Sequence, residues 1–234
     1  MRIKTILLTL FVIALIALTG CQQREENTIN VQGDSELTFK PDKAEVWVGI
    51  SILKPNATAA QNEANKVIND IVDGLRYKGI KEEDIQTENL NLYEEKEWKD
   101  GETKSVGWRA TQTLKIKTTD LTKVGIIVDV AVNNGANQIN SINFGLSEEK
   151  EKEYKKQALT EATKNAREKA ETIAESLGVK LGKVKTVSES NFYYRPYVYA
   201  MAKASGVEAI QEAATVLPSD VTVTANINIV YTVG

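Results

Sequence analysis

The chain has 234 residues, with 29 basic and 32 acidic side chains, one cysteine and no histidine. The absence of histidine excludes a Ser-His-Asp or Cys-His nucleophile and any histidine-ligated metal. We expect no metal and no cofactor. The small acidic excess offers no basic surface to nucleic acid, and we expect no nucleic-acid partner. Carboxylates, tyrosines and lysines are the acids and bases that remain.

The first twenty residues have the pattern of an export signal. A basic start precedes an apolar run over residues 6–17, which is too short to span a bilayer comfortably. The run leads into the sequence LTGC, with a branched residue three positions before Cys21 and small residues in between. This arrangement resembles the lipobox of bacterial lipoproteins.

We therefore expect residues 1–20 to be removed and Cys21 to receive a diacylglycerol. The mature protein would then lie outside the cytoplasm, anchored to the cell membrane or to an outer membrane by the lipid on Cys21. Residues 21–28 would act as a polar tether, followed by one domain over residues 29–234. The alternative is an ordinary signal peptide or an uncleaved anchor beside an incidental cysteine.

Alternation of apolar and polar residues predicts two strands, over 29–39 and 44–52, that we expect to pair as a hairpin. Thr58 is expected to cap an amphipathic helix that ends at Gly79. A third strand over 85–93 should have its register broken near Asn89.

The next segment is a charged loop over 94–105 with its turn at Asp100 and Gly101, before an alternating strand over 106–116. Asp120 can cap a short helix that ends by Gly135.

The longest predicted helix runs from Glu148 to Leu177. Its apolar face consists mostly of alanines, which allow a helix to lie close against a sheet. Before it, residues 142–146 alternate as a strand, and after it Val184 and Val187 indicate another. The alternating run 221–231 should be an internal strand, because a chain end is otherwise poorly held.

Two segments repeat at a spacing of 99 residues, where Gly79 and Gly178 each follow a helix and precede a strand. The predicted fold class is α+β: two β-α-β-β repeat units, at about 43–118 and 138–233, plus an extra strand at the N-terminus. We expect antiparallel sheets with helices packed on one face.

The loop of the second repeat is unusually aromatic, and it is followed by residues 207–214 with helical spacing. It packs its own domain, contacts a partner or a second copy, or closes over a small molecule, and the sequence leaves these alternatives open. Glu94, Glu95 and Glu97 of the first loop form either a solvated tip or a carboxylate-dependent hydrolase site. The candidate contact residues are Phe192, Tyr193, Tyr194, Arg195, Tyr197 and Tyr199.

The order of several short motifs resembles the SIMPL-domain family of exported bacterial proteins. The resemblance covers about residues 28–233 and implies a two-layer α+β protein of the periplasm or cell surface, with ring-forming oligomers and oxidative-stress tolerance among its members. It implies no catalytic residue. The motifs are Val31, Gly33, Phe39-Lys40-Pro41-Asp42-Lys43-Ala44, Gly79-Ile80, Asp84-Ile85-Gln86-Thr87, Leu177-Gly178, Leu181-Gly182-Lys183-Val184, Pro218, Ala225 and Tyr231.

From these observations we expect a non-enzymatic, lipid-anchored envelope protein that associates with itself and acts as a scaffold or binding module. The alternative is an envelope lipoprotein that binds a small molecule through the aromatic segment 192–201.

Overall fold

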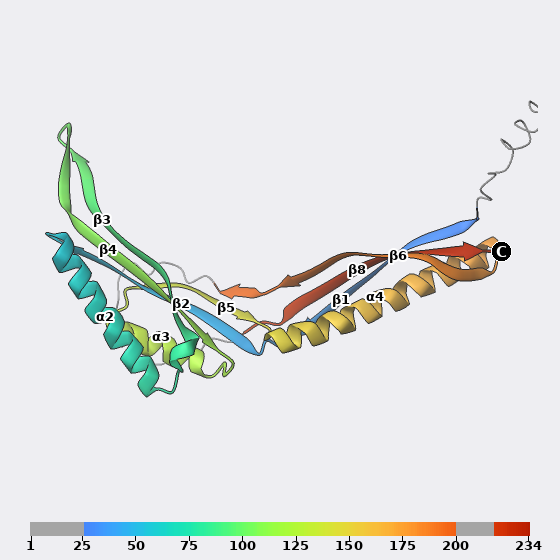
Figure 1. Cartoon of the computed structure of the whole chain (residues 1–234), viewed down its shortest axis with the longest axis horizontal. Coiled ribbons are helices and arrows are strands. Elements are labelled where there is room, and N and C mark those ends of the chain that lie inside the picture. Colours follow the sequence, from blue (N-terminus) through green and yellow to red (C-terminus); the bar gives the residue numbers. More distant parts are fainter. Residues whose placement is uncertain (1–25, 200–217) are drawn as a thin grey trace, which may run out of the picture. The chain divides into compact units, whose positions relative to one another are not determined.

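The computed structural model describes residues 26–199 and 218–234 (Figure 1). Cys21, the signal peptide and the segment 207–214 therefore lie outside the described residues. The elements are β1 (Thr28–Phe39), β2 (Lys43–Lys54), α2 (Ala57–Tyr77), a 3-10 turn (Glu82–Asp84), β3 (Ile85–Lys99), β4 (Glu102–Thr118), α3 (Lys123–Asn133), β5 (Gln138–Gly145), α4 (Glu148–Leu177), β6 (Leu181–Arg195), β7 (Tyr197–Tyr199) and β8 (Val221–Val233).

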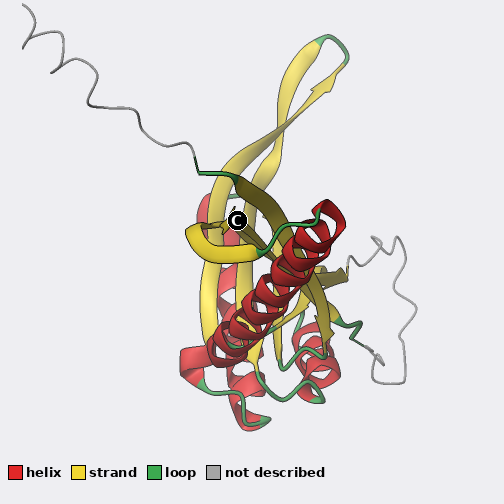
Figure 2. Ribbon diagram, turned by 90° about the vertical axis from the view of Figure 1, so that its right-hand side faces the viewer, coloured by secondary structure: helices red, strands yellow, loops and turns green. Residues whose placement is uncertain are grey.

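The predicted α+β class is confirmed. The strands form two antiparallel sheets, of order β1-β8-β6 and β3-β4-β2-β5-β7, and the helices pack against them (Figure 2). Chain order gives β2-α2-β3-β4 and then β5-α4-β6-β7-β8, which matches the predicted β-α-β-β succession apart from the additional short strand β7. β8 lies between β1 and β6, so the last strand is internal as expected.

The described residues form two compact units. The first contains residues 26–33, 163–190 and 227–234, and the second contains 34–162, 191–199 and 218–226. Strands β1, β6 and β8 and helix α4 contribute residues to both. The predicted domain limits, 29–234 with repeats at about 43–118 and 138–233, stay a prediction.

The core of the second unit lies between the five-stranded sheet and helices α2 and α3. Alternate residues of β2, from Ala44 to Ile50, are buried, and Leu114 and Ile116 of β4 face the same way. Apart from the buried Gly49, the intervening residues are only partly buried, as expected for a sheet with a single covered face. The apolar positions of these strands are therefore the ones that face α2 and α3.

The first unit is smaller and uses the alanines of α4. Ala166, Ala170 and Ala174 are buried on the helix, together with Val31 of β1 and Ile229 of β8. A larger side chain on this helix face would force the axis away from the strands, because close-packed interiors have little spare volume.

The expected β1–β2 hairpin is wrong. β2 pairs with β4 and β5, whereas β1 belongs to the other sheet and lies beside β8. The turn at Pro41 and Asp42 does separate the two strands, and the Asp42 N–H donates to the Gly145 carbonyl at 3.0 Å. Alternation gives the faces of a strand but does not specify which strand lies beside it.

The charged segment 94–105 is also different from the expected loop. Residues 94–99 continue β3 and residues 102–105 begin β4, and only Asp100 and Gly101 form the turn. Both turn residues have positive φ, 55° and 82°, which suits a two-residue hairpin. The predicted turn and the register break near Asn89 are confirmed.

Helix α2 begins earlier than predicted. Asn56, not Thr58, is the N-cap, and its Oδ1 accepts a hydrogen bond from the Ala59 N–H at 2.9 Å. Asn56 has an extended backbone, with φ −139° and ψ 159°, which is the conformation that an N-cap requires. Gly79 has a φ of 78°, consistent with the predicted end of the helix.

Candidate functional site

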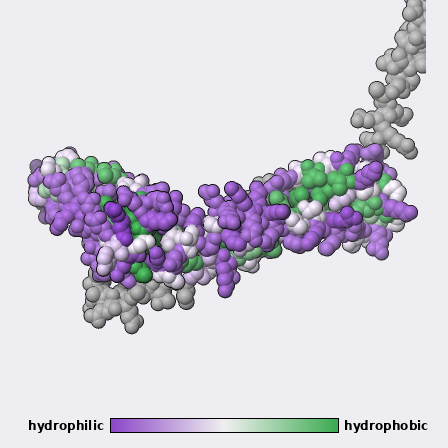
Figure 3. Space-filling view, turned by 60° about the horizontal axis from the view of Figure 1, so that its bottom comes forward, coloured by the Kyte–Doolittle hydropathy of each residue, from purple (hydrophilic) through white to green (hydrophobic). Residues whose placement is uncertain are grey.

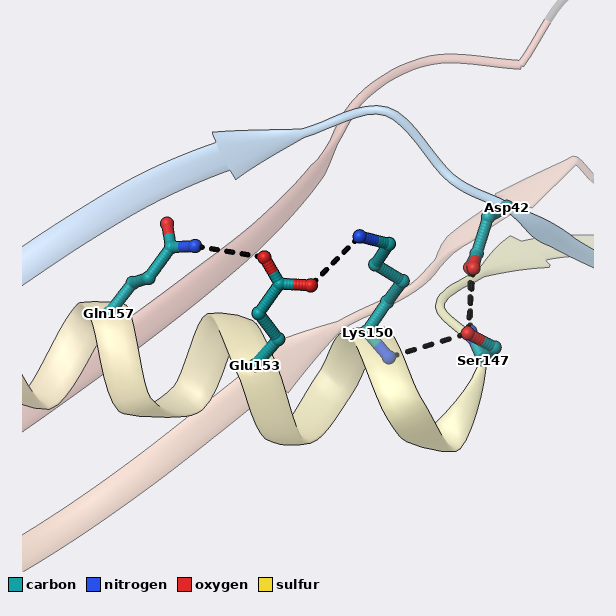
Figure 4. A network of polar contacts seen from close by, with 5 residues as sticks. All are labelled: Asp42, Ser147, Lys150, Glu153 and Gln157. Atoms are coloured by element: carbon teal, nitrogen blue, oxygen red, sulfur yellow. Dashed lines mark hydrogen bonds and ion pairs between the residues drawn. The ribbon is translucent and has the colours of Figure 1, made fainter.

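The start of α4 is fixed by Asp42, a residue of the turn after β1. The two carboxylate oxygens of Asp42 accept hydrogen bonds from the N–H and the Oγ of Ser147, each at 2.6 Å (Figure 4). The Ser147 Oγ in turn accepts from the Lys150 N–H at 3.4 Å. Ser147 thus caps the helix, and Asp42 adds negative charge where the helix dipole favours it.

The next turn of α4 continues this polar network along the helix surface. The Lys150 Nζ lies 2.8 Å from a Glu153 carboxylate oxygen, and the Gln157 side-chain amide donates to the other oxygen at 3.3 Å (Figure 4). The hydrogen bond to Glu153 raises the pKa of Lys150 above its ordinary value. These groups are solvent-exposed neighbours on a helix, so the network contributes little to stability.

Tyr194 connects the aromatic segment to the same junction. Its hydroxyl accepts a hydrogen bond from the Leu146 N–H at 2.7 Å, immediately before α4. Burial raises the pKa of Tyr194 above its ordinary value. Gly145 lies against the ring, and a Cβ there would collide with the tyrosine hydroxyl. This tyrosine therefore packs on its own chain.

The remaining candidate contact residues are placed only in part. Tyr193 is 57% exposed and its carbonyl accepts from the Thr224 Oγ1 at 3.2 Å. The backbone of the other four belongs to β6 and β7, and β7 pairs with β5. Their contact role stays a prediction, because the side chains of Phe192, Arg195, Tyr197 and Tyr199 lie outside the described part of the structure.

An exposed apolar surface lies elsewhere, on the hairpin of β3 and β4. Beyond Trp108, β4 has no partner other than β3 in the described registers, so the two strands continue as a ribbon (Figures 1 and 2). We call residues 89–106 the hairpin arm, and its residues 89–94 pair with the part of β4 that also pairs with β2. Trp98 of the arm is 71% exposed, Leu90 is 53% exposed and Leu92 is 36% exposed.

The candidate carboxylates Glu94, Glu95 and Glu97 lie on the arm, and basic side chains hold the first two. Glu95 forms an ion pair with the Nε of Arg109, whose Nη1 donates to the Ser51 Oγ at 2.9 Å. The pKa of Glu95 is lowered by this hydrogen bond to Arg109, and the pKa of Glu94 is lowered by hydrogen bonds from Lys96 and then Ser105. Carboxylates held in the charged form suit a solvated ribbon better than general acid catalysis.

A groove lies beside α4 within the second unit. It has a volume of about 580 Å³ and runs between Leu37 of β1 and the helix. Beside it, the rings of Phe39 and Tyr154 stack with centroids 3.6 Å apart. The helix side of the groove is polar and consists of Glu153, Lys156, Gln157, Thr160 and Glu161.

Within residues 26–199 and 218–234, no group of three or more histidine, cysteine, aspartate or glutamate side chains is arranged to hold a metal ion. In the same ranges, no helix has the length and apolar character needed to cross a bilayer.

The sequence did not identify the hairpin arm as an exposed surface. Leu90, Leu92 and Trp98 all occupy even-numbered positions of β3, which was a readable signal. This spacing was not recognised because the charged residues between Glu94 and Lys104 suggested an unpaired loop.

The fold and its surfaces define an α+β protein with two antiparallel sheets, in which family motifs such as Asp42 hold the junctions between elements. The chain belongs to the SIMPL family, described as proteins of unknown function (DUF541), whose pattern matches residues 29–231.

Several relatives cover most of the chain. The uncharacterized protein YggE of Edwardsiella ictaluri is 29% identical over 186 residues, which are 78% of this chain and 77% of that protein. YggE of Escherichia coli K12 is 27% identical over 192 residues, covering 80% and 77%. The 26 kDa periplasmic immunogenic protein of Brucella melitensis is 28% identical over 193 residues, covering 77% and 76%.

Proposed function

We propose that this protein is a lipid-anchored, non-enzymatic component of the bacterial cell envelope that acts by binding, as a self-associating scaffold. The envelope location is supported by the export signal and by similarity to a protein named periplasmic. Anchoring is supported by Cys21, which ends the sequence LTGC after an apolar run too short for a comfortable membrane span. Two long acyl chains hold a protein at a membrane far better than one.

A binding role is favoured by the chemistry of the chain. The sequence has no histidine, and lipid attachment would consume its one cysteine, so the usual activated nucleophiles are not available. Two carboxylates of the hairpin arm, those of Glu94 and Glu95, form ion pairs with Lys96 and Arg109. Stress tolerance, implied by the family resemblance, is the physiological setting we propose for this binding.

Self-association is carried by one observation, the exposed apolar side chains of the hairpin arm. Figure 3 shows hydrophobic areas separated by a largely hydrophilic surface. Trp98 lies on the two-stranded ribbon beyond the part of β4 that pairs with β2, whereas Leu90 and Leu92 lie on the outer strand of the five-stranded sheet and are still exposed. Exposed apolar side chains on an outer strand favour contact with another protein surface.

The size of the full-length chain in a mild non-ionic detergent tests this proposal. We expect sedimentation equilibrium to give more than one protein chain per particle when micelles are in molar excess. Replacing Trp98 by Ser should shift the equilibrium toward single chains, whereas replacing the exposed Tyr77 of α2 by Ser should not. A single chain per particle at all concentrations would rule out the scaffold.

A further inference from the structure

The outer strand β3 has features that favour pairing with another strand. It is the first strand in the order β3-β4-β2-β5-β7, so one of its edges has no neighbouring strand among the described residues. From Asn89 to Lys99 it pairs with β4 without a skipped residue of its own, because the second register shift omits Val106 of β4. This edge lacks proline and bulges over eleven residues, two of the devices that normally block edge pairing.

On one face of β3, the order of the side chains is complementary to the same order read in the opposite direction. Leu92, Glu94, Lys96 and Trp98 are successive residues of one face, because side chains alternate along a strand. Read in the opposite direction, the same face is Trp98, Lys96, Glu94, Leu92. Two copies that run antiparallel therefore bring apolar residues opposite apolar ones and acids opposite bases.

We propose that β3 pairs antiparallel with β3 of a second copy about a two-fold axis at Glu95. Each Leu92 then lies opposite Trp98 of the second copy, and each Glu94 opposite Lys96 of the second copy. This inference rests on the proposed self-association and assigns it to one strand and one register.

The register is selected by charge. An axis at Glu94 would place Glu94 opposite itself and Leu92 opposite Lys96, and an axis at Lys96 would place Lys96 opposite itself and Glu95 opposite Glu97. Like charges directly opposite each other destabilise a sheet, whereas opposite charges and apolar pairs stabilise it. The axis at Glu95 creates one like-charge contact, and there each Glu95 is already paired with Arg109 of its own chain.

Pairing would also solve a local problem of stability. A two-stranded ribbon is at best marginally stable in water, and three or more strands with an apolar face are needed for independent stability. The arm extends beyond the part of β4 that pairs with β2, which ends at Trp108. Two arms side by side form four strands of order β4-β3-β3-β4, with Leu92 and Trp98 sharing one face.

Charge reversal in the full-length chain tests the register. In detergent with micelles in excess, Glu94→Lys and Lys96→Glu should each raise the dimer dissociation constant about tenfold or more, since each creates two like-charge contacts. Mixing the two variants should restore association, because both positions are then basic in one chain and acidic in the other. The double variant should associate like the wild type. Glu102→Lys, in the matching Lys104–Glu102 pair of β4, should have no effect.

These variants separate this inference from the broader proposal. If the wild type associates but the single variants associate equally well, or if mixing them restores nothing, the pairing through β3 is wrong while self-association stands. If the wild type never associates, both the pairing through β3 and the proposed self-association are wrong. Circular dichroism of each variant shows that the fold is intact, and the double variant controls for any local effect of losing the 3.0 Å Lys96–Glu94 pair.

Discussion

At the scale of single residues, Asp42 shows what a family motif does in this fold. The resemblance to the SIMPL family included Pro41 and Asp42, but the sequence indicated only a turn there. In the structure the Asp42 carboxylate binds the N–H and hydroxyl of Ser147, more than one hundred residues away in the chain. A contact of this range leaves no local pattern, so the sequence predicted the turn and not its partner.

Asp42→Ala should lower the free energy of unfolding by about 1–2 kcal/mol, because it removes both hydrogen bonds at the start of α4. Urea denaturation followed by circular dichroism measures the change. Asp73→Ala is the matched control, since Asp73 makes only a 3.9 Å exposed pair with Arg76 and should change stability by less than about 0.5 kcal/mol. Equal losses in the two variants would contradict the capping role.

Tyr194 should make stability depend on alkaline pH. Its pKa is raised in the folded protein by burial, so its contribution is complete below about pH 10 and is lost as the pH rises through the higher folded value. Tyr194→Phe should cost about 1 kcal/mol at neutral pH through the lost hydrogen bond to Leu146, and this difference should shrink above about pH 10.

Denaturation of the wild type and of Tyr194→Phe across this pH range gives the difference directly. Tyrosinate absorbance should also show a late-ionising tyrosine in the wild type that is missing from the variant. Tyr77→Phe, at an exposed position of α2, is the control and should leave the late-ionising tyrosine and the pH dependence of stability in place. A constant difference between the wild type and Tyr194→Phe at all pH values would contradict the assignment.

At the scale of elements, the alternation of apolar and polar residues predicted which face of a strand is buried, but it did not predict which strands pair with each other. The buried positions of β2 and β4 follow the predicted alternation because α2 and α3 cover a single face of their sheet. The strands of the hairpin arm were not predicted beyond Tyr93, because both of their faces carry charged side chains. Apolar and polar residues alternate clearly only where one face of a strand is buried in a core. Its turn at Asp100 and Gly101 was predicted, since positive φ at both positions has a clear residue preference.

The base of the hairpin arm should not tolerate a side chain at Gly107. This residue has a φ of 136°, and a Cβ would lie 2.6 Å from the Lys54 carbonyl oxygen of the neighbouring strand. We expect Gly107→Ala to cost about 1–3 kcal/mol, because the backbone must shift or remain strained. Thermal unfolding monitored by calorimetry measures the loss.

Gly101→Asn is the matched control for Gly107→Ala. Gly101 also has a positive φ, of 82°, but a Cβ there meets nothing within 4 Å, and asparagine adopts this conformation readily. We expect a change within about 1 kcal/mol. A control that is as destabilised as Gly107→Ala would show that backbone conformation, and not the contact with Lys54, is responsible.

At the scale of the whole molecule, the sequence predicted the α+β class and the central place of the last strand. It did not predict that β1 leaves β2 and lies beside β8, because this pairing joins the two ends of the domain and neighbouring strands usually pair with each other. The sequence left the role of the aromatic segment open, and the structure distinguishes two of its residues. Tyr194 is partly buried and hydrogen-bonded to Leu146, whereas Tyr193 is exposed. Composition identified an unusually aromatic segment, but it did not indicate which of the aromatic side chains pack against the rest of the chain.

The proposed position of the whole molecule in the cell depends on Cys21. Metabolic labelling with palmitate, followed by mass spectrometry of the mature N-terminus, tests lipid anchoring most directly. We expect the mature chain to begin at Cys21, to carry the label and to remain in the membrane fraction, and Cys21→Ala to lose both label and membrane association. A mature wild-type chain that begins elsewhere, or that is unlabelled and soluble, would contradict the account.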